Sequence, residues 1–65
     1  MELRNDVDLA NTREKLREFQ ERYRARQQET PEDKHIHRLT LMSLKRVINQ
    51  LIEDIARYES RVHRV

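Results

Sequence analysis

The stretch QETPEDKH, residues 28–35, decides the architecture of this chain of 65 residues. It contains the only proline, and the chain has no glycine. The residue before a proline is disfavoured in helical conformation, so a first helix should end near Gln28. Thr30 can then cap a second helix, with Pro31 at the first helical position and Asp33 at the third, reaching back to the cap. The stretch predicts a bend between two helices and not a linker between two domains.

A later start for the second helix remains open. If residues 29–38 form a longer loop, Thr40, followed by Ser43, can cap a helix that begins near residue 40, and the two helices then match in length. If the second helix begins at Pro31, it is longer than the first and extends beyond it. We prefer the early start, because proline at the first helical position is the stronger signal.

The segment after the bend carries an uninterrupted heptad pattern. Its apolar residues alternate in steps of three and four: Leu41, Leu44, Ile48, Leu51, Ile55, Tyr58, Val62 and Val65. Val47 and Ile52 widen this seam to an arc of roughly 140°, which is more than one partner helix covers. With the early start, Tyr58, Val62 and Val65 also extend beyond the first helix. We therefore expect a second copy of the chain to cover them.

The segment before the bend has a matching seam, formed by Leu9, Thr12, Leu16, Phe19 and Tyr23. Asn5 or Asp6 can cap its start, which predicts a helix over about residues 6–28. Leu3, Val7 and Ala10 fall on a different side of the same helix, where they contact a second partner or flank a fraying end.

These patterns predict an all-α protein, an antiparallel two-helix hairpin of coiled-coil type. Helix one covers about residues 6–28, the bend 29–30 and helix two about 31–63. A single core in so short a chain contributes about 3–5 kcal/mol, and without cysteine no disulfide can add to it, so we expect a homodimeric four-helix bundle. The expected interface comprises Leu16, Phe19, Tyr23, Leu41, Leu44, Val47, Ile48, Leu51, Ile52, Ile55, Tyr58 and Val62.

Charge is abundant but mixed in sign. The chain has 14 basic and 12 acidic residues, a net charge of +2, which is typical of solvated helix surface. In the heptad frame Arg13 is an e position and Lys15 and Arg22 are g positions. The second helix carries Glu59 at e and Asp54 at g, so some of this charge could be paired across the helices. An arginine ridge of Arg13, Arg17 and Arg24 could instead follow a phosphate backbone. We favour a module for self-assembly and for docking a partner protein, with a small nucleic-acid-binding regulator as the alternative.

Other functions have little support in the sequence. Glu32 and His35 have the spacing found in di-iron helical bundles, but the seams supply no further carboxylates, and His35 and His37 lie about 160° apart on a helix. We expect no metal or cofactor, and no catalysis, because a two-helix protein lacks a cleft for a substrate. The acidic start MELRNDVD and the lack of long apolar runs predict a cytoplasmic protein that does not enter membranes.

Residues 39–60, LTLMSLKRVINQLIEDIARYES, carry a resemblance, together with DLANTREKL at residues 8–16. Residues 39–60 resemble the C-terminal half of small, uncharacterised bacterial two-helix proteins, and residues 8–16 belong to the same resemblance, which brings no function with it. In layout the chain is also similar to the plasmid-encoded repressor-of-primer proteins, hairpins that dimerise into a four-helix bundle and bind an RNA pair. This second similarity concerns the fold alone and transfers no residues.

Overall fold

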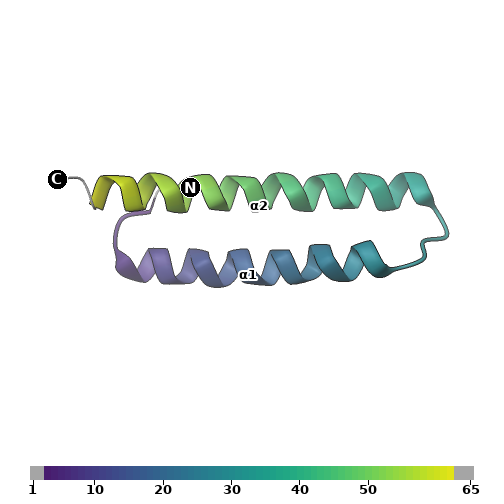
Figure 1. Ribbon diagram of the computed structural model, residues 1–65, viewed down its shortest axis with the longest axis horizontal. Helices are drawn as coiled ribbons and strands as arrows, with labels where there is room; N and C mark the ends of the chain where they lie inside the picture. Colours follow the sequence, from purple (N-terminus) through teal and green to yellow (C-terminus); the bar gives the residue numbers. More distant parts are fainter. Residues whose placement is uncertain (1–2, 63–65) are drawn as a thin grey trace.

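The computed structural model describes residues 3–62, and these form an all-helical hairpin. Helix α1 covers Asp6–Gln28 and helix α2 covers Lys34–Val62. The two run antiparallel and pack against each other, with the loop of residues 29–33 at one end and the start of α1 beside the end of α2 at the other (Figure 1). The predicted two-helix fold is confirmed. Val65, the last residue of the predicted seam, lies outside the described residues. The same is true of residue 63, at which the second helix was predicted to end.

Helix α1 begins and ends at local signals. Asn5, one of the two candidate caps, has extended backbone and accepts a hydrogen bond from the Asp8 amide through Oδ1 at 2.9 Å. Asp6 and Asp8 place negative charge in the first turn, where it favours the exposed amides of the helix start. At the other end, Glu29 returns to extended backbone and its amide donates to the Arg26 carbonyl at 3.2 Å.

Helix α2 begins three residues later than Thr30 and Pro31 predict. The cap is Asp33, whose Oδ1 accepts hydrogen bonds from the amides of His35 at 2.9 Å and Ile36 at 3.1 Å. The predicted cap at Thr30 is therefore wrong, and so is the alternative start near Thr40. An aspartate caps a helix better than a threonine, and its charge also favours the positive end of the helix dipole.

The core is one narrow seam between the helices. From α2, Ile48, Leu51, Ile55 and Tyr58 are buried. From α1, Thr12 is buried, while Leu9, Leu16, Phe19 and Tyr23 are half-buried. Thr12 can occupy this seam because its hydroxyl donates to the Asp8 carbonyl at 2.7 Å, one turn earlier in the same helix.

Residues 3–5 form an N-terminal strap, which crosses from the start of α1 to α2 (Figure 1). Leu3 is only 2% exposed and packs with Ile55 and Tyr58. Arg61 holds the strap by donating from Nη2 to the Leu3 carbonyl at 2.9 Å. Leu3 therefore lies before the helix and inside the core, and not on a second face of α1 as its position in the sequence predicted.

The strap corrects a second prediction, that Tyr58 needs cover from another copy of the chain. Tyr58 is 7% exposed, beneath Leu3 of its own chain. Its hydroxyl donates to Asp6 Oδ1 at 2.9 Å, at the start of α1. Val62, one turn further along α2, is 52% exposed. The N-terminal strap thus covers the overhang of α2 as far as Tyr58.

Candidate functional site

The hairpin is a single layer of two helices, so its seam is open to solvent on two sides. One side holds a groove lined by Arg22, Ala25, Arg26, Glu29, Thr40 and Leu44. The other holds a groove lined by Gln20, Tyr23, Arg24, Gln27, Lys45, Ile48 and Asn49. Neither involves the strap, and the two sides differ in chemistry.

The first side is mainly apolar. Val47 follows Thr40 by one heptad, so it lies on this side, where it is 38% exposed. Ile36, about three turns before Val47, is also exposed, and Phe19 is half-buried beneath the Arg22 guanidinium, 5.1 Å from the ring centre. We call Phe19, Thr40, Leu44 and Val47, with Ile36, the Val47 face.

The second side combines polar residues with apolar surface. Its groove has a volume of about 390 Å³ and takes Gln20, Tyr23, Arg24 and Gln27 from α1 and Lys45, Ile48 and Asn49 from α2. We call it the Arg24 groove. Ile52 follows Lys45 by one heptad and lies on this side, 44% exposed. Val47 and Ile52 therefore flank the seam on opposite sides of the hairpin.

The residues predicted as an oligomer interface divide into three groups. Four are buried inside the single hairpin: Ile48, Leu51, Ile55 and Tyr58. Five are half-buried: Leu16, Phe19, Tyr23, Leu41 and Leu44. Three remain exposed: Val47, Ile52 and Val62. The first group holds the two helices of one chain together, so only the other two groups are left for contact with a second molecule.

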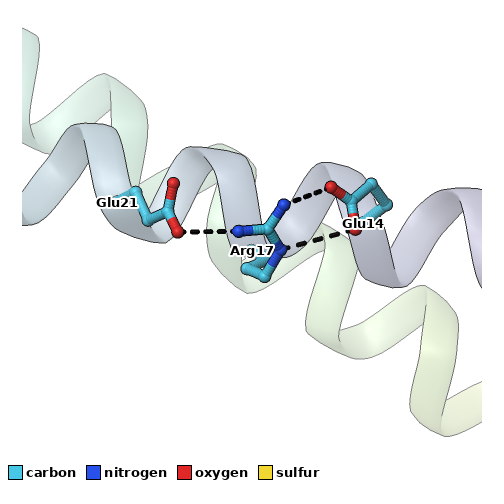
Figure 2. Close-up of polar contacts among 3 residues, drawn as sticks. All are labelled: Glu14, Arg17 and Glu21. Atoms are coloured by element: carbon cyan, nitrogen blue, oxygen red, sulfur yellow. Dashed lines mark hydrogen bonds and ion pairs between the residues drawn. The ribbon is translucent and has the colours of Figure 1, made fainter.

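Two of the three ridge arginines have carboxylate partners. Arg13 Nη2 lies 3.1 Å from Glu59 Oε1, which is one pair of the kind that the e and g positions allowed. Arg17 lies between Glu14 and Glu21 on α1, as Figure 2 shows. Its Nη1 donates to Glu21 Oε1 at 2.8 Å, while Nε, at 3.4 Å, and Nη2 both donate to Glu14. Neither guanidinium is therefore free for a phosphate.

The contacts among Glu14, Arg17 and Glu21 shift the pKa values of Glu14 and Arg17. The hydrogen bonds from Arg17, together with its charge, lower the pKa of the Glu14 carboxyl below its ordinary 4.5. The same contacts raise the pKa of the Arg17 guanidinium. All three side chains are largely in solvent, so the cluster stabilises the exposed surface of α1 only modestly.

Arg24 differs from the other two. Within residues 3–62 it makes no ion pair or hydrogen bond, and Lys45 across the groove makes none either. The side chains of Arg13, Arg17 and Arg24 therefore do not form a continuous ridge of three unpaired arginines, which a nucleic-acid contact would need. The ridge contributes one unpaired guanidinium.

The histidines considered as metal ligands, His35 and His37, lie near the start of α2. His35 is exposed and His37 is half-buried. Across the described part of the chain no group of three or more histidine, aspartate or glutamate side chains converges. Neither helix, over residues 3–62, contains a segment long and apolar enough to span a bilayer.

Sequence reasoning missed the Arg24 groove because it treated the two helices separately. A signal was nevertheless present: Lys45 has no acidic residue three or four positions away, and Arg24 has only Glu21. Lys45 and Asn49 were not considered as site residues, since both lie outside the heptad seam.

No protein-family model matches the chain, and neither a curated protein nor a solved structure matches it. The resemblance of residues 39–60 to small bacterial two-helix proteins stays a prediction.

Proposed function

We propose that the protein is a non-catalytic helical module that self-associates as a homodimer and docks a partner protein. In the dimer, two hairpins pack through their Val47 faces as a four-helix bundle. The observation that carries this proposal is the exposure of Val47, beside half-buried Phe19 and Leu44, after α1 has already packed on α2.

The total surface area supports a second layer. The hairpin measures 51 × 16 × 15 Å and exposes 5603 Å². Compact monomers of this size expose about 4,500 Å², so the hairpin exposes roughly 1,100 Å² more. One partner in a stable dimer contributes about 800 Å² or more to the interface. The excess is thus of the size that one dimer contact would bury.

A second copy fits the Val47 face for a chemical reason. A two-fold dimer joins the same patch on both chains, so an apolar patch is matched by itself. Its rim carries Arg22, Arg26 and Glu29, and Arg26 Nη1 lies 3.4 Å from Glu29 Oε2, so one of the two cations is already paired. The stems of the two arginines can lie along apolar surface while their charges stay in water. The opposite side, with Arg24 and Lys45, would place like charges against each other in such a dimer.

Sedimentation equilibrium at micromolar concentration tests the dimer, using Val47→Glu and the matched control Ile52→Glu. Both positions lie on α2 and are similarly exposed, but on opposite sides of the hairpin. Burying an unpaired carboxylate is costly, so Val47→Glu should dissociate the dimer and Ile52→Glu should not. Glutamate also forms helix at least as well as valine or isoleucine, so the hairpin itself should persist.

A parent chain that sediments as a monomer with intact helicity would refute the dimer. If Ile52→Glu dissociates the assembly while Val47→Glu leaves it intact, the dimer exists but uses the other side of the hairpin.

A further inference from the structure

The Arg24 groove holds two cations from different helices, Arg24 and Lys45, that no residue between 3 and 62 neutralises. Elsewhere on the same flank of α1, Arg13 and Arg17 both have carboxylate partners. Arg24 has glutamines at positions 20, 27 and 28, one turn before and after it, and its acidic neighbour Glu21 is taken by Arg17. On this flank of α1 the unpaired positive charge therefore lies at Arg24, in the half of the hairpin nearer the loop.

The remaining lining suits an acidic side chain on an apolar backing. Gln20, Gln27 and Asn49 carry amide groups that can donate hydrogen bonds to an oxygen anion. Tyr23 and the buried Ile48 supply apolar surface beside them. None of the seven described lining residues is acidic, so an entering carboxylate meets no like charge.

We infer that the Arg24 groove binds a glutamate or aspartate side chain, flanked by apolar residues, of a partner protein. The inference rests on the proposed function, since it names the chemistry of the partner that the module docks. A guanidinium can take a carboxylate through two parallel hydrogen bonds, and Lys45 adds a second charge from the facing helix. Because the groove and the Val47 face lie on opposite sides, a dimer leaves both of its grooves open.

Charge distribution favours a carboxylate over a nucleic acid. Binding to a phosphate backbone draws on several basic residues spaced along it. With Arg13 and Arg17 paired, this flank of α1 presents Arg24 alone, joined by Lys45 at the same place. Two cations that line one groove match one acidic side chain and its neighbours.

The test is an NMR titration of the full chain with a blocked peptide of alternating leucine and glutamate pairs. Its isostere with glutamine in place of glutamate, and an oligothymidylate of similar length, are the comparison ligands. We expect the peptide to shift the side-chain amide signals of Gln20, Gln27 and Asn49. The double variant R24Q/K45Q should bind it about five- to tenfold more weakly, as expected for the loss of two exposed ion pairs.

The control is the double variant R46Q/R57Q, which removes the same charge from exposed positions of α2 outside the groove. It should change the affinity by less than about twofold. Equal weakening by the two double variants, or equal binding of the glutamine peptide, would overturn the inference. So would binding of the oligothymidylate alone, which would favour a nucleic-acid ligand.

Dimerisation is measured separately on the same samples by sedimentation. If the parent chain is monomeric but still binds the acidic peptide through Arg24 and Lys45, the proposed dimer is refuted and the binding site in the groove is supported. If the parent chain is a dimer but does not bind the peptide, the binding site in the groove is refuted and the proposed dimer is supported.

Discussion

Replacing Leu3 with alanine tests whether the N-terminal strap is part of the core. Leu3 is 2% exposed and packs on Ile55 and Tyr58. Burying a leucine completely contributes about 1.5–3 kcal/mol, and truncating one in a packed core costs about 2–5 kcal/mol. Ordering each backbone residue of the strap opposes this by roughly 1–2 kcal/mol. The strap is therefore held by a narrow margin, and Leu3→Ala should release it.

Once the strap is released, all of its contacts are lost, so the loss in the free energy of unfolding cannot exceed the net contribution of the strap. We therefore expect a loss of at most about 2 kcal/mol, the low end of the range. The assay is urea denaturation followed by circular dichroism at one fixed protomer concentration, because assembly would otherwise shift the midpoint. At this chain length, a loss of about 2 kcal/mol lowers the melting temperature by about 8–16 °C.

Val7→Ala is the control, since Val7 lies in the first turn of α1 but is 68% exposed. It should change the free energy of unfolding by less than about 0.5 kcal/mol. If Leu3→Ala unfolds at the same urea concentration as Val7→Ala, the strap does not stabilise the hairpin. Tyr58 would then need cover from another copy of the chain after all.

Two further predictions concern the cap of α2 and the response to alkali. Asp33→Ala should lower the free energy of unfolding by about 0.5–2 kcal/mol, because it leaves the amides of His35 and Ile36 without their acceptor. The control Thr30→Ala should change it by no more than about 0.5 kcal/mol. Equal losses for the two variants in urea denaturation would show that Asp33 is not the cap. Burial, the hydrogen bond to Asp6 and the charge of Asp6 raise the pKa of the Tyr58 phenol above its ordinary 10.0. The folded state thus holds this proton more tightly than the unfolded state, so the contribution is complete below pH 10 and is lost as the pH rises through the folded-state pKa. Tyr58→Phe should therefore lose less stability than the parent as the pH rises above about 10, and identical losses would contradict the buried phenol.

The sequence alone determined the two helices and the seam that joins them. Heptad spacing in residues 41–62 and the matching spacing from Leu9 to Tyr23 are local patterns, and a helix places such residues on one side whatever surrounds it. The bend followed from Pro31, because proline restricts the residue before it. The heptad frame also allowed charge pairing across the helices, and the structure shows one such pair, Arg13 with Glu59.

The tertiary structure decided what lies across from each pattern. Thr30 and Asp33 are both possible caps by local chemistry, and the stronger acceptor, Asp33, is the one used. Leu3 fits a helical face equally well by spacing, but the overhang of α2 offers it a buried position against Tyr58. The Arg24 groove exists only because packing sets α1 beside α2, which brings Arg24 to Lys45. Periodicity describes one helix at a time, whereas burial and charge pairing depend on residues distant in the sequence that folding brings together.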